Sequence, residues 1–373
     1  MESVGHTAFN QTKDRRLKFC FGNEKKNLIR HVYSPPKSRK RWKLDEFLNV
    51  DIIRYFAFGR HALATGLQFV GVEKGDQVLL PEFICRDLLS SINAIGAEPV
   101  FYPIDDKLNP GRLKKTLPKV KAIIAVNYFG FPQNLDPFRE YCERTGAALV
   151  EDNAHGLFSC DENGVYLGTR GDIGIFSLRK TTPMPDGAAL VVNRSRHCFQ
   201  KLDHGQFQSR KIPRSFRSKQ LLRRITPWAG IWLLKSATLA ARRVRELRTG
   251  FSVLPSPQAA EWLLPEPKFT SEKSLFFLQS LNVEKEKQRR RELFQLVEQI
   301  LSKTPCKPVF QSLPQYTVPY MYPFYAQPED MKSIKHALFQ KGLECFPWPE
   351  LPDSVKSTAP AHYRNIWGVN FLW

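Results

Sequence analysis

Residues 147–193, AALVEDNAHGLFSCDENGVYLGTRGDIGIFSLRKTTPMPDGAALVVN, decide the fold of this 373-residue chain. The stretch contains three short apolar runs, AALV, IGIF and AALVV, separated by polar and glycine-containing segments. Such runs are typical of strands that are buried inside a sheet. Polar residues follow the first two runs, with Asp152 after one and Lys180 after the other. We therefore predict buried strands that carry reactive side chains at their ends.

The same alternation extends upstream to about residue 55. Strand-like segments occur at 75–83 (GDQVLLPEF), 98–105 (EPVFYPID) and 120–130 (VKAIIAVNYFG), and the segments between them hold apolar residues at helical spacing. Gly96 and Gly146 end two of these helical segments, as glycine commonly does. Strands that alternate with helices predict an α/β fold in which helices flank a mostly parallel sheet.

The length of the chain predicts more than one domain, since an ordinary core is built from about 100–200 residues. We expect a basic N-terminal segment at 1–50 and a large domain at 51–265 that contains a basic helical insertion at about 200–250. Residues 266–373 combine helical patterns with strand-like segments such as YTVPYMYPFYA and ECFPW. They predict a small α+β C-terminal domain.

The seven cysteines are scattered and never spaced as CxxC, which argues against a disulfide framework or a zinc ribbon. We therefore expect no metal site. The first residues lack the apolar core of an export signal, and no run of about 18 apolar residues occurs in the chain. These features favour a cytoplasmic protein.

The net charge of +20 is concentrated in two segments. Residues 1–50 carry +7 and residues 201–250 carry +11, so the rest of the chain is nearly neutral. In 201–250, tryptophans and aliphatic residues stand among arginines. This mixture is typical either of a solvated helical face or of a helix that lies on an anionic membrane surface. Nucleic acid is not expected as a partner, because no recognised motif accompanies the charge.

Polar residues follow several of the predicted strands, where open α/β sheets bind their ligands. They include His155 and Ser177 besides Asp152 and Lys180, and Asn127 follows the strand at 122–126. Each feature alone has a structural explanation. A strand-end Asp commonly caps a turn, Asn127 could close one, and a lone His is more often a satisfied core residue than a ligand. The order of the residues along the chain favours a common site.

A pyridoxal phosphate enzyme needs an amine for a Schiff base, a carboxylate at the ring nitrogen, a phosphate cup and packing against the ring. Lys180 supplies the amine and can also move a proton during transamination. Asp152 supplies the carboxylate, and Ser177 has a hydroxyl for the phosphate. The phosphate cup is completed by amides at the start of a helix, those of Gly59, Arg60 and His61.

The chain resembles the DegT/StrS family of sugar aminotransferases, which are fold type I pyridoxal phosphate enzymes. The resemblance rests on GRHALATGLQFVGVEKGDQVLLPEFICRDLLSSINAIGAEPVFYPID, KAIIAVNYFGFPQNLD, VEDNAHGLF and GTRGDIGIFSLRKTTPMPDGAALVV. It implies that Asp152 binds the ring nitrogen, His155 the ring hydroxyl, Ser177 the phosphate and Lys180 the aldehyde carbon. It also implies a homodimer with sites at the interface.

The sequence departs from the family pattern at four points. Ser177 and Lys180 are two residues closer than in most members. Cys85 occupies the position of the aromatic that usually stacks on the ring, and Phe83 is the nearest aromatic. The Asn-Tyr-Arg element that reaches the partner's phosphate is not recognisable near 265–275, where Lys268 is a weak substitute. The sequence ends at WGVNFLW, so we expect an abbreviated small domain.

The resemblance implies transfer of an amino group, with glutamate as the expected donor, to a keto group of a nucleotide-linked or lipid-linked sugar in polysaccharide or glycan biosynthesis. The departures also leave open a second hypothesis, in which the chain is a catalytically silent relative that serves as a binding or membrane-associated subunit. If the basic segment at 201–250 is a helix on anionic lipid and not a solvated face, it would place a cytoplasmic protein at the inner membrane surface.

Overall fold

The computed structural model describes residues 36–38, 40–110, 113, 117–193, 207–218, 220, 221, 240, 244, 247, 248 and 257–371. Most of the two basic segments therefore lies outside the described residues. The tryptophans and arginines on which the predicted membrane contact depends also lie outside the described residues. They are Trp228, Trp232, Arg223, Arg224, Arg242 and Arg243.

A seven-stranded sheet forms the centre of the larger part of the molecule, with the strand order β1-β7-β6-β5-β4-β2-β3. Its strands are β1 (Ile52–Phe56), β2 (Gln77–Pro81), β3 (Glu98–Tyr102), β4 (Ala122–Val126), β5 (Ala148–Asp152), β6 (Ile173–Phe176) and β7 (Ala188–Val192). The pairs from β3 to β6 are parallel, whereas β7 runs antiparallel to both β6 and β1. Every strand segment predicted between residues 75 and 193 is present.

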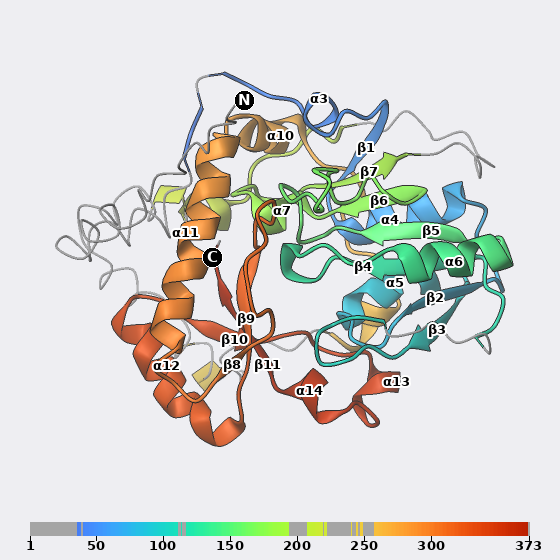
Figure 1. Cartoon of the computed structure of the whole chain (residues 1–373). Coiled ribbons are helices and arrows are strands. Elements are labelled where there is room, and N and C mark those ends of the chain that lie inside the picture. Colours follow the sequence, from blue (N-terminus) through green and yellow to red (C-terminus); the bar gives the residue numbers. More distant parts are fainter. Residues whose placement is uncertain are drawn as a thin grey trace, which may run out of the picture.

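Helices cover the sheet, as Figure 1 shows for α4, α5 and α6. They are α3 (Leu44–Leu48), α4 (Gly59–Phe69), α5 (Leu89–Asn93), α6 (Asp136–Thr145) and the short α7 (Leu178–Thr181). Helix α4 lies close to β6 and β7 because Gly66 has no side chain: a Cβ there would come within 2.7 Å of Ile173 Cδ1. Gly146 ends α6 in the left-handed conformation with φ 76, as predicted.

The C-terminal part contains a four-stranded antiparallel sheet in the order β10-β11-β9-β8. Its elements are α10 (Glu272–Gln279), α11 (Val283–Leu301), β8 (Lys307–Pro308), β9 (Met321–Tyr325), α12 (Met331–Gln340), β10 (Cys345–Pro347), α13 (Asp353–Lys356), α14 (Ala361–Arg364) and β11 (Ile366–Asn370). Figure 1 shows the long helix α11 running along one side of the molecule toward this sheet. The sequence analysis assigned no strand to β11, which is nevertheless a central strand of the small sheet.

The two parts meet through aromatic side chains near the carboxyl ends of the large sheet. Trp348, which follows β10, packs edge-on against Phe129 with ring centroids 4.8 Å apart and against Phe83 at 5.3 Å. Tyr363 of α14 also contacts Phe83, and its hydroxyl accepts a hydrogen bond from the amide of Ile104. The small sheet therefore lies against the edge where the predicted site residues gather. Within the described residues, no helix is long and apolar enough to cross a membrane.

Candidate active site

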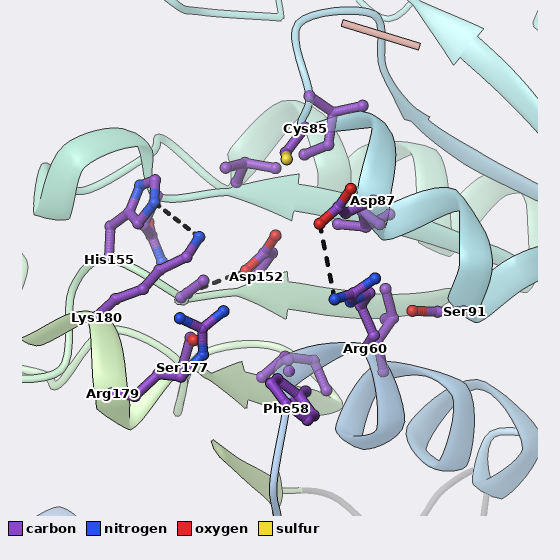
Figure 2. Close-up of a pocket in the computed structure, with 18 of the residues that line it drawn as sticks. Phe58, Arg60, Cys85, Asp87, Ser91, Asp152, His155, Ser177, Arg179 and Lys180 are labelled. Carbon is purple, nitrogen blue, oxygen red and sulfur yellow. Dashed lines mark hydrogen bonds and ion pairs between the residues drawn. The ribbon is translucent and has the colours of Figure 1, made fainter. Parts of the chain in front are cut away.

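The carboxyl ends of β4, β5 and β6 border a pocket that brings together eight of the nine predicted site residues (Figure 2). Parallel strands end at the same edge of a sheet, so residues far apart in the sequence converge there. The predicted residues that line the pocket are Gly59, Arg60, Cys85, Asn127, Asp152, His155, Ser177 and Lys180. His61 is the exception.

Lys180 and His155 contact each other directly, with Nζ of the lysine 3.1 Å from Nε2 of the imidazole. The other ring nitrogen, Nδ1, accepts a hydrogen bond from the amide of Phe129 at 3.3 Å. In the neutral imidazole the proton therefore lies on Nε2, which can only donate. Lys180 must accept that hydrogen bond as an uncharged amine.

The electrostatics of the pocket favour the same protonation state. Burial lowers the pKa of Lys180, and neighbouring Arg179 lowers it further, while Cys85 and Asp152 oppose the shift. Burial also lowers the pKa of His155 well below its ordinary value, and Lys180 adds to the effect. The pocket thus favours the uncharged amine, which is the nucleophilic form of a lysine.

Two aromatic rings fix the orientation of His155. Tyr320 stacks on one side with ring centroids 4.5 Å apart and an interplanar angle of 9°, and Phe129 is nearly parallel at 5.9 Å. The amide of Tyr320 donates to the carbonyl of Phe129 at 2.8 Å, which joins the two segments. His155 is therefore held in one plane, with Nε2 directed at Lys180.

Asp152 is the last residue of β5 and is 7 % exposed. Its Oδ1 accepts a hydrogen bond from the amide of Ala154 at 3.0 Å. Burial raises the pKa of Asp152, against the opposing effects of Lys180 and of this amide. A cationic ring nitrogen placed beside the carboxylate would reverse that penalty, because a buried negative charge is stabilised by a positive neighbour.

Ser177 and the start of α4 form another part of the wall. Ser177 is 5 % exposed, and a Cβ added to Gly59 would lie 3.8 Å from the Cβ of Ser177. The amide of His61 donates to the carbonyl of Phe58 at 3.1 Å, so it is already used within the helix. The His61 side chain contacts the carbonyl of Pro265 at 2.6 Å and does not line the pocket. The amides of Gly59 and Arg60 are thus the ones that the start of α4 offers.

Residues 43–203 match the model of the DegT/DnrJ/EryC1/StrS aminotransferase family. This match confirms the predicted resemblance of the segment to that family. The GDP-perosamine synthase of Vibrio cholerae is 30% identical over 185 residues, which are 46% of this chain and 50% of that protein. The chain thus spans about half the length of the curated relatives that it matches.

Solved structures of this type resemble almost the whole chain. Helicobacter pylori PseC, described as an aminotransferase involved in the biosynthesis of pseudoaminic acid, has 17% identity and a TM-score of 0.58, covering 92% of this chain and 90% of its own. The putative sugar aminotransferase Spr1654 from Streptococcus pneumoniae, in its PLP form, has 15% identity and a TM-score of 0.58, with 94% and 91% coverage. At this identity the likeness shows the fold, and it confirms the predicted fold class.

The aromatic contacts of the pocket differ from those that the resemblance predicts. Cys85 lines the pocket, but Phe83 is fully buried among Tyr128, Trp348 and Tyr363 and does not line it. Phe83 is therefore not available as the stacking residue. Lys268, the suggested substitute at the phosphate, packs on Phe269 and does not line the pocket of its own chain.

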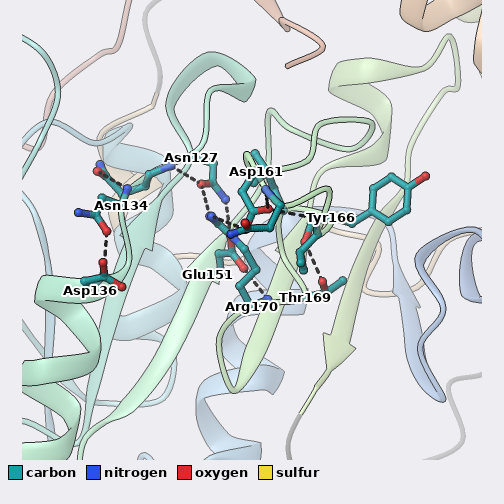
Figure 3. A network of polar contacts seen from close by, with 12 residues as sticks. Asn127, Asn134, Asp136, Glu151, Asp161, Tyr166, Thr169 and Arg170 are labelled. Atoms are coloured by element: carbon teal, nitrogen blue, oxygen red, sulfur yellow. Dashed lines mark hydrogen bonds and ion pairs between the residues drawn. The ribbon is translucent and has the colours of Figure 1, made fainter. Parts of the chain in front are cut away.

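Asn127 lines the pocket, yet its side chain is bound to neighbouring protein groups (Figure 3). Its Nδ2 donates to Glu151 at 2.8 Å, and its Oδ1 accepts from the amide of Gln133 at 2.9 Å and from Arg170 at 3.0 Å. Arg170 in turn pairs with Glu151 at 2.6 Å. The geometry assigns Asn127 to this network, and its predicted contact with a cofactor stays a prediction.

The lining residues that the sequence analysis missed include the polar or aromatic side chains of Phe58, Asp87, Ser91, Arg179 and Trp348. Two had a local signal, since Phe58 directly precedes Gly59 and Arg179 directly precedes Lys180. Trp348 comes from the small sheet, so only the tertiary fold brings it near the pocket.

A second missed group lies behind the pocket, on α11. Arg290 is fully buried and donates to the carbonyls of Thr181 at 2.6 Å and of Tyr320 at 3.1 Å. Glu286 accepts from both Arg290 and Arg289. Arg290 thus connects the residue after Lys180 with the ring that stacks on His155. In the sequence this segment, EKEKQRRREL, has the pattern of a solvated charged helix face.

Proposed function

We propose that the chain is a pyridoxal phosphate-dependent aminotransferase that transfers an amino group to a keto group of a nucleotide-linked sugar. The observation that carries the proposal is the position of the Lys180 amine, 3.1 Å from His155, in one pocket with Asp152 and Ser177. The family match of residues 43–203 and the sugar aminotransferases among the similar proteins support the same reaction class.

The pocket fits the cofactor in the chemistry of its donors. Lys180 offers an amine for the aldehyde carbon, Asp152 a carboxylate for the ring nitrogen, and Ser177 with the start of α4 offers donors for the phosphate. His155, which also lines the pocket, would bind the ring hydroxyl. When bound, pyridoxal phosphate supplies an electron sink for the carbon that loses its proton.

The residues of this chain would then control protons and position. Nε2 of His155 holds the Lys180 amine uncharged, so Nζ is ready to attack a carbonyl carbon. Once an amino donor has displaced the lysine, the same Nζ would be free to take the proton from the donor's α-carbon and to deliver it to another carbon of the reacting group. Arg290, through Thr181 and Tyr320, keeps the lysine and the histidine aligned.

Absorbance spectra of the purified protein with pyridoxal phosphate, before and after addition of glutamate, test the cofactor and the half-reaction. We expect a yellow protein whose visible band is lost with glutamate, and borohydride should attach the cofactor covalently at Lys180. Lys180→Ala should abolish the attachment, while Lys332→Ala, on exposed surface of α12, should leave it unchanged. Unchanged spectra in Lys180→Ala would contradict the assignment.

The rival hypothesis is a catalytically silent relative. Cys85 favours it, because the pocket has no aromatic side chain at the position where family members stack one on the ring. A protein that binds pyridoxal phosphate but shows no spectral change with a panel of amino donors would support this rival over the aminotransferase.

Two further parts of the proposal concern assembly and location. We expect a homodimer, which sedimentation velocity would detect as twice the mass of one chain. We also expect peripheral contact with anionic membrane through 201–250, measured as sedimentation with anionic liposomes. Retention of that binding after neutralisation of the arginines in 214–248 would contradict the membrane contact.

A further inference from the structure

Trp348 reaches the pocket from the small sheet, where it directly follows β10. Its ring centroid lies 4.8 Å from that of Phe129, 5.3 Å from that of Phe83 and 5.3 Å from that of His155, with interplanar angles of 63°, 73° and 63°. Tyr128 meets the same ring at 82°. All these contacts are edge-to-face, so within the described part of the chain the indole has no ring stacked parallel to it.

The other aromatic rings that line the pocket, those of Phe58 and His155, already have partners on their faces. The guanidinium groups of Arg60 and Arg179 lie over Phe58, with Cζ 5.9 Å and 5.6 Å from the ring centroid. The imidazole of His155 lies between the two nearly parallel rings described above. Trp348 is therefore the lining residue that can offer a parallel aromatic contact to a ligand ring.

Arg86 joins the larger part of the molecule to the segment that follows Trp348. Its guanidinium pairs with Asp353 at 2.7 Å and with Glu350 at 3.4 Å, and its amide donates to the carbonyl of Glu350 at 2.8 Å. Glu261 pairs with Arg86 at 3.2 Å and also accepts from the amide of Asp353 at 2.9 Å. Arg86 is only 5 % exposed, so this ion-pair cluster is a fixed connection between the two parts.

We propose that the indole of Trp348 is the surface on which the pyridine ring of the cofactor packs, and that Arg86 is the positioning residue that holds this indole in the pocket. The inference rests on the proposed function. Arg86 directly follows Cys85, which lines the pocket with its thiol (Figure 2), so the same connection holds the indole beside the Cys85 segment. Asp152 would keep the ring nitrogen protonated, and the electron-rich face of an indole attracts such a cationic ring.

Pyridoxamine phosphate tests this contact apart from the Schiff base, because it carries an amine in place of the aldehyde and cannot react with Lys180. Its affinity and that of pyridoxal phosphate are measured by equilibrium dialysis for the wild type, Trp348→Ala, Trp348→Phe and a matched control. The control, Trp262→Ala, removes an exposed indole that does not line the pocket. Trp348→Ala should weaken both compounds about tenfold, Trp348→Phe less than about threefold, and the control should bind both as the wild type does.

A double-mutant cycle tests whether Arg86 acts through Trp348. Arg86→Met should weaken pyridoxamine phosphate roughly three- to tenfold in the wild type, but less than about twofold in a protein that already carries Trp348→Ala. Arg139→Met, which removes an exposed cation from α6, is the control and should change neither affinity. If Arg86→Met does not fold, Asp353→Asn removes the charge of the more exposed partner and should act in the same direction.

The possible results separate the inference from the function on which it rests. Unchanged affinities in Trp348→Ala would overturn the packing contact, and so would weakening of pyridoxal phosphate alone, which would place the effect at Lys180. Equal weakening by Arg86→Met in both backgrounds would overturn the positioning role. These results would leave the proposed function intact, whereas a wild type that binds neither compound would overturn the proposed function and this inference with it.

Discussion

Glu151 and Asp152 are adjacent residues of β5, but they belong to two polar clusters that differ in how fully their groups are hydrogen-bonded. Glu151 belongs to the network with Asn127 and Arg170, in which both carboxylate oxygens accept hydrogen bonds from the protein (Figure 3). Asp152 faces the pocket (Figure 2) and, among the described residues, accepts one hydrogen bond, from the amide of Ala154. Successive side chains of a strand point to opposite faces, so one strand end can carry both clusters.

The difference separates stabilising groups from groups kept for a ligand. A buried charge that is fully paired contributes to holding the strands in place, and breaking the pair is costly. Polar groups without partners reduce stability and are retained where a ligand completes them. Asp152 accepts from Ala154 and Lys180 contacts His155, so these two pocket residues are less fully paired than Glu151 and are closer to the second kind. Substitutions in the two clusters should therefore have opposite effects on stability and on cofactor binding.

The largest effect is expected for Arg170→Met, which removes the cation paired with Glu151. Glu151 is fully buried, so the variant leaves a carboxylate without its charge partner. Such a change costs about 3–5 kcal/mol of unfolding free energy. Urea denaturation of the cofactor-free protein measures it. Adding Glu151→Gln to the variant should recover part of the loss, and a loss below about 1 kcal/mol would show that the network is not a stabilising element.

The sequence predicts where polar residues lie along the strands better than it predicts which groups their side chains contact. Buried strands and the residues after them could be recognised from apolar runs, so Asp152, His155, Ser177 and Lys180 were all found. Asn127 follows its strand in the same way, but its partner Arg170 lies 43 residues away and turns its side chain into the network. Similarly, α11 has the pattern of a surface helix, yet Arg290 is buried because carbonyls from two other segments surround it.

Asn127→Ala should have an intermediate effect and decide which cluster Asn127 serves. The substitution leaves the amide of Gln133 without an acceptor and removes one donor from Glu151. Unsatisfied buried groups cost about 1–3 kcal/mol each, so we expect a loss of unfolding free energy in that range. Affinity for pyridoxal phosphate, measured in folded protein, should change less than threefold. A tenfold or larger loss of affinity with unchanged stability would instead place Asn127 among the cofactor contacts.

The pH dependence of stability should distinguish the titratable pocket from the paired network. Because the pKa of Lys180 is lowered in the folded state, the unfolded chain binds one more proton between that value and the ordinary 10.5. Stability of the cofactor-free protein should therefore rise with pH in this window, by at most about 1.4 kcal/mol per unit from this group. Lys180→Met should lack this contribution, whereas Lys332→Met should keep it. Parallel curves for wild type and Lys180→Met would contradict the uncharged lysine.

The smallest effect on stability is expected for Asp152→Asn. Comparison of this variant with Glu151→Gln should give the clearest difference between the pocket and the paired network. Burial raises the pKa of Asp152, so the folded protein gains little from its charge, and an amide oxygen can still accept from Ala154. We expect a change in unfolding free energy below about 1 kcal/mol, which is typical where no buried pair is broken. Glu151→Gln removes the charge partner of Arg170 and should cost several times more unfolding free energy.

The two variants should rank in the opposite order in their affinity for pyridoxal phosphate, measured by absorbance titration. Asp152→Asn should lose most of the affinity, since an amide cannot hold the ring nitrogen protonated, and folded Glu151→Gln should keep it. Equal losses of stability in the two variants would mean that Asp152, too, is part of the structural network.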